Sequence, residues 1–242
     1  LLTKEELGYM KQHMNEVPAF GRVVDDLLQK ADEACAAAIQ IPTPVDGGGG
    51  AVHEQHKSNY YAMFHAGLAY QYTGHKKYAD FVAQMLMEYA QKYPKWGLHP
   101  VNLSPVPGRL FWQTLNESVW LVHTAMAYDC VYDALSAKQR KFIEKNLLFN
   151  MADFIMNGYG DRKGNHEMFN RMHNHATWAT SAVGMVGMTT GNQSLVRKAL
   201  YGTDETGKNG GFLRQMDYLF SPDGYYTEGA YYQRYAIWPF VV

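Results

Sequence analysis

The 242-residue sequence has little of what defines several large classes of protein. It contains only two cysteines, Cys35 and Cys130, which excludes a disulfide-rich scaffold. Both lie in stretches with helical character, so we expect small apolar residues of a core rather than a disulfide or redox pair. No run approaches the roughly 18 apolar residues of a membrane span, and the first residues lack the basic-then-apolar order of a signal peptide. The sequence therefore predicts no membrane partner.

The sequence also lacks an excess of charge of either sign. It has 22 Lys and Arg against 23 Asp and Glu, for a formal net charge of -1 at pH 7. A chain with this balance has no global attraction to nucleic acid or to anionic lipid. We therefore expect no nucleic-acid partner, and an anionic ligand would need a local basic site.

Apolar and aromatic residues, by contrast, are abundant. Hydrophobic residues make up 47% of the chain, which over this length is enough for one large domain with a buried core, placed at residues 1–242. The aromatic residues include 18 Tyr and 5 Trp. Such rings stack on the faces of sugars, but tyrosines also line helix interfaces with their hydroxyls in water. Composition alone leaves both interpretations open.

Apolar residues recur at helical spacing along most of the chain, and turn signals divide it into paired helices. Thr3 with Glu6, and Ser136 with Gln139, form capping boxes that each open a helix. A long loop rich in Pro and Gly, 40–56, could serve as a lid or a cleft wall. The predicted helices cover residues 3–15, 18–39, 58–73, 75–93, 112–135, 136–156, 174–190 and 192–201.

Weak internal repetition at the level of helical hairpins is typical of stacked helix pairs. The stretch 174–191 has small residues along its length, whereas its partner 192–202 carries charge, which favours an inner ring of helices wrapped by an outer one. We find no convincing strands. The sequence therefore predicts an all-α fold, an incomplete (α/α) toroid. Because the last residues are apolar and uncapped, we expect this chain to be the N-terminal part of a longer protein.

The first candidate site lies in "NRMHNHATWATSAVGM", residues 170–185. Asn174 is a good N-cap, which would place His175 in the first helical turn, beside unpaired backbone N–H groups that bind carboxylates. The same positive field disfavours an imidazolium, so His175 would stay neutral near pH 7 and could accept a proton. The alternative is a capping asparagine followed by a packed, hydrogen-bonded histidine.

A metal is a poor interpretation of the same stretch. His173 and His175 would point to different faces of a helix, and no carboxylate or cysteine stands at ligand spacing. The letters HNH match a nuclease motif only as letters, because this segment leads into a helix of small residues. We expect neither a metal nor an organic cofactor.

The second candidate site is "SPDGYYTEGAYYQRYA", residues 221–236, where a turn at Pro222-Asp223-Gly224 leads into a tyrosine-dense segment. Tyr232 and Tyr235 would share a helical face, with Arg234 beside them. A phenol is a proton donor, and a nearby positive charge stabilises the tyrosinate left behind. The alternative is an aromatic helix seam.

The third candidate site is "PGRLFWQTLNESVW", residues 107–120. Helical spacing would place Arg109, Gln113 and either Asn116 or Glu117 on one side, where they could bind sugar hydroxyls and carboxylates. A solvated helix face is the alternative. Paired catalytic carboxylates of a glycoside hydrolase would have to come from Glu117, Asp223 and Glu228, none of which has a recognisable acid–base partner.

Four stretches together carry a family resemblance over roughly residues 57–240: "NYYAMFHAGLAYQYTG", "PGRLFWQTLNESVWLVHTAMAYD", "RMHNHATWATSAVGMVGM" and "DGYYTEGAYYQRYA". In this order they resemble the N-terminal domain of polysaccharide lyase family 17, the alginate and oligoalginate lyases. The resemblance implies an α/α toroid followed by a heparinase-II/III-like β-sheet domain. It also implies exolytic β-elimination at 4-linked uronates of alginate, and a periplasmic or secreted bacterial protein.

Matched positions carry over roles from the family. Asn174 resembles the residue that neutralises the uronate carboxylate, and His175 resembles the proton acceptor. Tyr232 resembles the catalytic acid, although Tyr231 could align with it instead. We expect the substrate to contact Gln113, Asn116, Tyr231, Arg234 and Tyr235. A glycosaminoglycan lyase of the same fold and a non-catalytic carbohydrate-binding toroid are the alternatives.

Overall fold

The computed structural model describes residues 3–13, 16–101, 104–158 and 168–242. Over these residues the fold is all-α, as predicted, with one isolated antiparallel bridge between Phe220 and Tyr226. No helix among them is both long and apolar enough to cross a membrane. The main helices are α1 (Lys4–His13), α2 (Pro18–Ala36), α3 (Ala51–Thr73), α4 (Lys76–Lys92), α5 (Thr114–Val131), α6 (Ala137–Ile143), α7 (Phe149–Asn157), α9 (Asn174–Thr190), α10 (Gln193–Tyr201), α11 (Phe212–Leu219) and α12 (Ala230–Val241). Short 3-10 segments follow α4 and α5, and a π-helical turn, η3 (Glu144–Leu148), joins α6 to α7.

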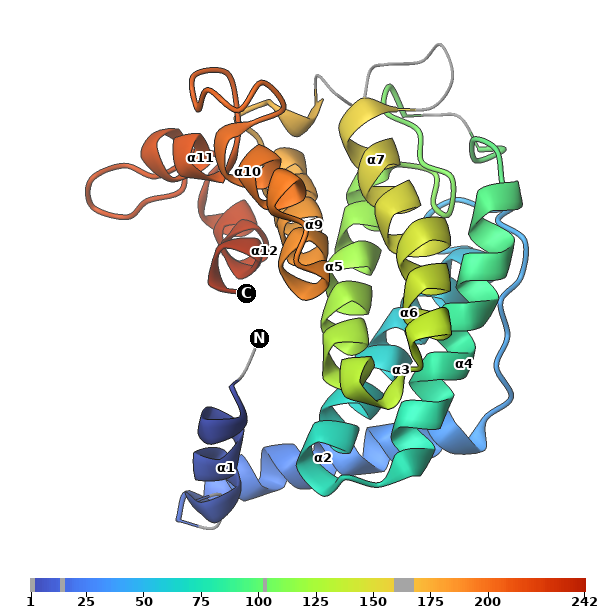
Figure 1. The fold of residues 1–242 in the computed structure, drawn as a ribbon. Helices are drawn as coiled ribbons and strands as arrows, with labels where there is room; N and C mark the ends of the chain where they lie inside the picture. The colour runs from blue at the N-terminus through green and yellow to red at the C-terminus, as the bar shows by residue number, and fades with distance from the viewer. Residues whose placement is uncertain (1–2, 14–15, 102–103, 159–167) are drawn as a thin grey trace.

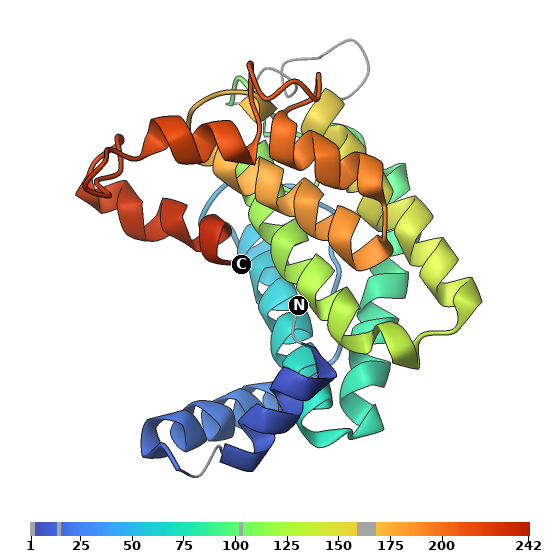
Figure 2. The same ribbon diagram turned by 60° about the vertical axis from the view of Figure 1, so that its left-hand side comes forward.

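The helices form a curved arc with α1 and α12 at its two ends (Figures 1 and 2). Helix α5 packs between α3 and α9, while α4, α7 and α10 lie on the outer side of these three. Because each inner helix is followed by an antiparallel partner, α3, α5 and α9 run in the same direction. Their N-terminal ends therefore lie along the same rim of the arc, as an incomplete toroid requires.

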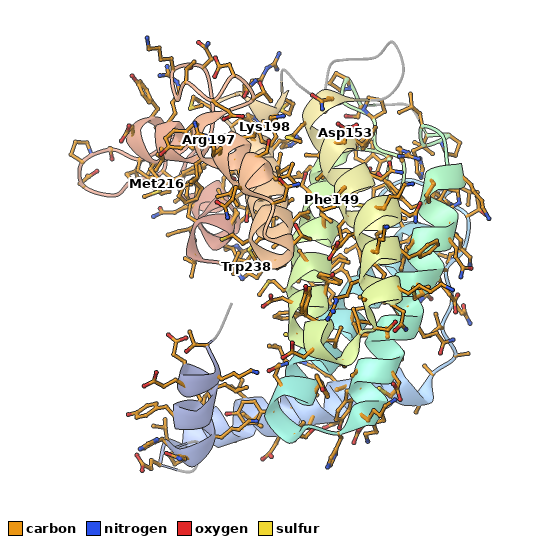
Figure 3. All side chains as sticks on the ribbon, in the orientation of Figure 1. Phe149, Asp153, Arg197, Lys198, Met216 and Trp238 are labelled. Atoms are coloured by element: carbon orange, nitrogen blue, oxygen red, sulfur yellow. The ribbon has the colours of Figure 1, made fainter. Side chains whose placement is uncertain are left out.

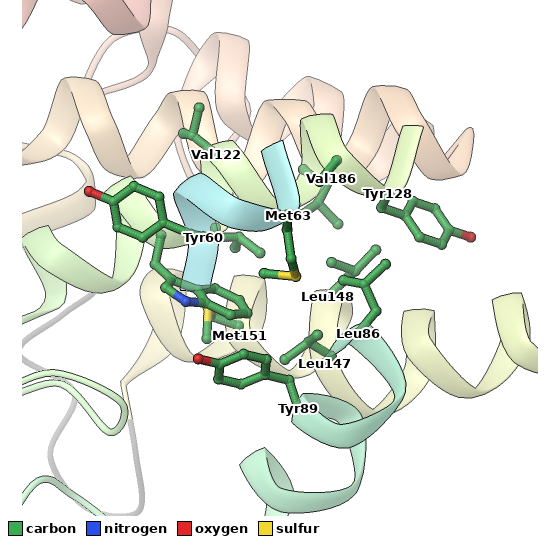
Figure 4. Packing of buried hydrophobic residues seen from close by; sticks show 14 of the residues in the cluster. Tyr60, Met63, Leu86, Tyr89, Val122, Tyr128, Leu147, Leu148, Met151 and Val186 are labelled. Atoms are coloured by element: carbon green, nitrogen blue, oxygen red, sulfur yellow. The ribbon is translucent and has the colours of Figure 1, made fainter. Parts of the chain in front are cut away.

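The core lies between the inner and outer helices (Figure 4). Met63 of α3, Leu86 of α4 and Leu148 of η3 are all fully buried in it. Tyr89 is fully buried as well, and its hydroxyl lies 2.8 Å from Nδ1 of His56. Tyr89 and Tyr93 are therefore interface residues of the core, as one interpretation of the tyrosines predicted, but their hydroxyls bond buried side chains instead of water.

Both predicted capping boxes are present. The Thr3 backbone N–H donates to Glu6 at 2.8 Å, and the Glu6 N–H donates to the Thr3 hydroxyl at 3.1 Å. Ser136 and Gln139 make the same reciprocal pair at the start of α6. The first predicted helix, 3–15, is observed as Lys4–His13, and its last two residues lie outside the described ones. Cys35 and Cys130 are free, as expected.

The predicted loop 40–56 is wrong at its C-terminal end, because α3 already begins at Ala51. The cause is Asp46, whose carboxylate accepts from the N–H groups of Val52 at 2.9 Å and His53 at 2.8 Å. This carboxylate satisfies two of the otherwise orphaned donors of the first turn. The residue that caps α3 therefore lies before the four glycines, so the composition of the Gly-rich stretch itself does not indicate where the helix begins.

The core predicts an acid sensitivity through His56 and His123. Burial lowers the pKa of each imidazole to about 4, whereas an unfolded histidine has a pKa of about 6.5. Between pH 6.5 and pH 4 these histidines therefore bind a proton in the unfolded chain but stay neutral in the folded chain. The free energy of unfolding is therefore highest above pH 6.5 and falls as the pH is lowered toward 4. At pH 5 each of these two histidines has lowered it by about 2 kcal/mol.

Urea unfolding at pH 7 and pH 5 measures this loss. In a His123→Gln variant, the amide still donates to the Val119 carbonyl that Nδ1 of His123 contacts at 2.8 Å, but it does not titrate. We expect the variant to lose about 2 kcal/mol less than the wild type between the two pH values. Equal losses in both proteins would contradict the assignment of this acid sensitivity to His123.

Candidate active site

The start of α9 differs from the sequence prediction by one residue. His173, not Asn174, is the N-cap, and its Nδ1 accepts from the His175 N–H at 3.2 Å. Asn174 is instead the first helical residue and is buried. The prediction favoured Asn174 because asparagine caps helices often, but a histidine ring with a free acceptor nitrogen makes the same bond here. His175 lies in the first turn, as predicted.

The backbone N–H groups at this helix start are already paired, contrary to the expectation that they are free for a ligand. The N–H groups of Ala176 and Thr177 donate to the His173 carbonyl at 2.9 and 3.2 Å. The Asn174 N–H donates to Oε1 of Glu228 at 2.8 Å. A carboxylate of the protein itself therefore occupies the positive end of α9, the position where a ligand carboxylate was expected.

Asn174 is held by its side chain too. Its Nδ2 donates to Oε2 of Glu228 at 2.5 Å, so both oxygens of one carboxylate bind one asparagine. An amide nitrogen carries two hydrogens, and this bond uses one of them. The other can point to an acceptor on a ligand.

His175 is half-buried, and its ring lies 4.7 Å from that of His173. Burial lowers the pKa of His175 to about 4, the neighbouring His173 lowers it further, and the charge of Glu228 acts in the opposite direction. The imidazole is therefore neutral at pH 7, as predicted, although the dominant cause is desolvation rather than the helix dipole. Its Nδ1 is buried without a hydrogen-bond partner among the described residues.

The tyrosine-dense segment begins with the predicted turn, in which the Gly224 N–H donates to the Ser221 carbonyl at 2.8 Å. Gly229 then precedes α12 with φ of +95°, a left-handed conformation that favours glycine. Tyr231 and Tyr232 follow in the first turn of α12, with their rings 5.5 Å apart, edge to face. Gly229 therefore provides the backbone turn that leads the tyrosine-dense segment into α12.

Four predicted substrate or catalytic residues lie together on α12. A surface pocket of about 380 Å³ is lined by Tyr231, Tyr232, Arg234 and Tyr235. Tyr231 is 78% exposed and Tyr232 is 43% exposed, so both hydroxyls belong to side chains that a ligand can reach. Tyr235 is more deeply placed, and burial raises the pKa of its phenol. Tyr232 and His175 make no hydrogen bond or ring contact with each other in the described part of the chain, and their joint action stays a prediction.

A chain of ring contacts holds α12 against the inner helices. Tyr60 of α3 lies 4.6 Å from His123 of α5, which stacks on Trp238 of α12 at 4.9 Å. Trp238, labelled in Figure 3, stacks in turn on Trp178 of α9 at 5.3 Å, and Trp178 lies 5.1 Å from Tyr235. Helix α12 therefore carries both an aromatic seam, through Trp238, and the candidate site residues. The seam and the site were the two interpretations of this segment, and they do not exclude each other.

The third candidate site is only partly as predicted. Gln113 and Asn116 are half-buried at the start of α5, where the Gln113 side-chain amide donates to Oδ1 of Asn116 at 3.0 Å. The start of α5 lies on the same rim of the arc as the start of α9 (Figure 1). These two residues therefore remain candidates for substrate binding.

Arg109 and Glu117, in contrast, do not belong to a polar strip. Arg109 precedes the helix and is 4% exposed, with its guanidinium donating to the carbonyls of Tyr93 and Trp96. Glu117 is fully buried and accepts from the Tyr93 hydroxyl at 2.9 Å and the Arg109 N–H at 2.8 Å. Its burial raises the pKa of this carboxyl to about 7. Both residues fasten the loop before α5 to the core.

The three carboxylates considered for a hydrolase do not face one another as a pair. Glu117 is buried beneath the loop, Asp223 is bonded to the Ser221 hydroxyl within its own turn, and Glu228 holds Asn174. Glu228 is the residue of this site whose role the sequence analysis missed. The only signal was an acidic residue shortly before the tyrosines. Among the described residues, no group of three or more His, Cys, Asp or Glu side chains is arranged to hold a metal.

The fold is the first observation that bears on the class of this protein. The all-α arc of paired helices is the fold that the sequence resemblance to a polysaccharide lyase family implied. The chain belongs to the alginate lyase family, whose model matches residues 11–242.

Two curated relatives are similar to the chain. The exo-oligoalginate lyase of Saccharophagus degradans is 44% identical over 241 residues, which cover all of this chain and 32% of that protein. The alginate lyase of Stenotrophomonas maltophilia is 49% identical over 206 residues, 85% of this chain and 27% of that protein. The chain thus spans about a third of the length of these relatives.

Proposed function

We propose that the protein containing this chain cleaves alginate or its oligosaccharides by β-elimination at 4-linked uronates, releasing 4,5-unsaturated units from chain ends. The observation that carries the proposal is the start of α9, where a fixed amide, Asn174, adjoins a neutral imidazole, His175. The family supports alginate as the substrate, and the name of the Saccharophagus relative supports the exolytic mode. A C-terminal β-sheet domain and export from the cytoplasm belong to the same proposal.

The first step removes the C5 proton of the uronate. That proton is weakly acidic and becomes removable when the negative charge that spreads onto the carboxylate is stabilised. The second amide hydrogen of Asn174 provides this stabilisation, assisted by Arg234 and Gln113. Because Nδ1 of His175 is buried, Nε2 is the nitrogen that takes the proton.

The second step breaks the bond between C4 and the glycosidic oxygen. The electron pair left at C5 forms the C4–C5 double bond, and the departing oxygen takes a proton from the Tyr232 hydroxyl. Mannuronate and guluronate present the C5 hydrogen on different sides. His175 would serve as the base for one epimer, and Tyr232 would serve both steps for the other.

Substrate choice is tested with the full-length protein and three acidic polysaccharides: alginate, heparan sulfate and hyaluronan. The ultraviolet absorbance of the new double bond reports elimination, and the size of the earliest products reports the mode. We expect alginate alone to yield the signal, with monomeric units released from the start. Signal only from a glycosaminoglycan would redirect the assignment to a lyase of that class. Alginate binding without any unsaturated product would indicate a non-catalytic toroid.

A further inference from the structure

Glu228 occupies an unusual place for an acidic residue in a site that has to bind an acidic sugar. It lies just before α12 and is half-buried, and both of its oxygens bind Asn174 at the start of α9. It is separated from Asn174 by 54 residues in sequence, so this contact joins two distant parts of the chain. The carboxylate is thus a structural link between the elements that carry Asn174 and Tyr232.

The donors that Glu228 binds explain why a carboxylate is needed there. The N–H of the first helical residue has no partner within its own helix, and the helix dipole adds positive charge at the same point. A carboxylate offers two oxygens, one for this N–H and one for the side-chain amide of Asn174. A glutamine would present an N–H donor in place of one of these oxygens, so the Asn174 donor on that side would lose its acceptor.

The segment that carries Glu228 is anchored on its other side. Tyr226 is fully buried, and its ring lies 5.4 Å from Phe220. Burial raises the pKa of the Tyr226 phenol, and the nearby charge of Glu228 raises it further. Glu228 therefore lies between the buried Tyr226 and Asn174.

We propose that Glu228 is a positioning residue for the elimination: it orients the side-chain amide of Asn174 toward the substrate carboxylate. This inference rests on the proposed function. Glu228 touches neither the base nor the leaving oxygen in this assignment. Its contribution passes through Asn174.

A double-mutant cycle in the full-length protein tests this role. We expect Glu228→Ala to lower kcat about 10- to 10²-fold, because misplacing a group that orients the substrate can cost about that much, with a smaller change in KM. In an Asn174→Ala background, the same substitution is expected to cost less than about 3-fold, since the group it orients is gone. Glu228→Gln, which keeps one acceptor, should fall between Glu228→Ala and the wild type. Asp217→Ala removes an exposed acidic residue of α11 and is the charge-matched control, expected to retain wild-type kcat.

Two kinetic outcomes would overturn the proposal. The first is a Glu228→Ala variant with wild-type kcat, and the second is an equal loss with and without Asn174. The latter would mean that Glu228 contributes to the fold or to catalysis without acting through Asn174.

Hydrogen exchange at the Asn174 amide gives a readout that does not depend on activity. The backbone N–H of Asn174, which donates to Glu228, should exchange at least about 10-fold faster in Glu228→Ala than in the wild type. Asp217→Ala should leave its exchange rate unchanged. If the wild type forms no unsaturated product from any acidic polysaccharide but this exchange difference is present, the proposed function fails and the Glu228–Asn174 link stands. If the wild type is active but Glu228→Ala changes neither the exchange rate nor the kinetic coupling to Asn174, the positioning role is wrong and the proposed function stands.

Discussion

Replacing Asn174 by alanine is expected to lower kcat of the full-length protein on alginate by about 10²- to 10³-fold, the usual cost of removing one donor that stabilises developing negative charge. The negative charge on the uronate carboxylate grows as the C5 proton leaves, so the amide of Asn174 binds the transition state more strongly than the ground state. The loss should therefore fall mainly on kcat and less on KM. Initial rates of double-bond formation over a range of oligosaccharide concentrations measure both.

Two further variants make this test specific. Asn157→Ala removes an exposed amide at the end of α7, where its side chain bonds Asp153 of the same helix, and should keep wild-type rates. Asn174→Asp keeps the size of the side chain but places a carboxylate against Glu228 and the substrate, so it should be at least as inactive as the alanine variant. Melting temperatures identify any variant whose fold is damaged. A loss of less than about 10-fold in a stable Asn174→Ala protein would exclude Asn174 as the main source of charge stabilisation.

Local patterns explain why so much of the fold could be predicted. The helices follow apolar spacing and the residues at their own ends, as Ser136 and Gln139 show for α6. The stacking of pairs follows from short turns such as Gly191 between α9 and α10, which adopts φ of +69°. These signals lie within a few residues of the structure that they determine.

The errors arose where a partner is distant in sequence or stands outside the expected element. Asp46 caps α3 from beyond four glycines, so the helix starts earlier than the loop composition indicated. Arg109 lies before α5 and turns into the core, whereas helical spacing placed it on a polar face. Packing against a distant part of the chain determines the position of Arg109, whereas the start of α3 depends on a carboxylate that lies outside the usual N-cap position.

The candidate site shows the same division. Asn174 and His175 are adjacent, and their place at the start of a helix could be predicted from the sequence to within one residue. Glu228 could not be assigned, because its binding to Asn174 depends on how α12 packs against α9 through Trp178 and Trp238. A helix start that the sequence predicted to be open to a ligand is therefore occupied by a carboxylate of the protein itself.

Tyr232→Phe is expected to lower the rate of elimination by at least about 10²-fold, because it removes only the hydroxyl that protonates the departing oxygen. The ring remains, so packing against Tyr231 and the melting temperature should change little. Substrate binding should survive, which calorimetry with an alginate oligosaccharide measures. The effect on rate without an effect on binding is what separates a proton donor from a contact residue.

Tyr231→Phe is the matched control, because the two tyrosines are adjacent in the first turn of α12 and both are exposed. Tyr231 is 78% exposed, and as a contact residue it should cost less than about 10-fold when its hydroxyl is removed. Both variants are prepared in the full-length protein and compared by formation of the unsaturated product. A dead Tyr231→Phe beside an active Tyr232→Phe would move the acid one residue back along α12. Two active variants would remove this helix from the proton transfer and leave the leaving oxygen to a donor elsewhere in the protein.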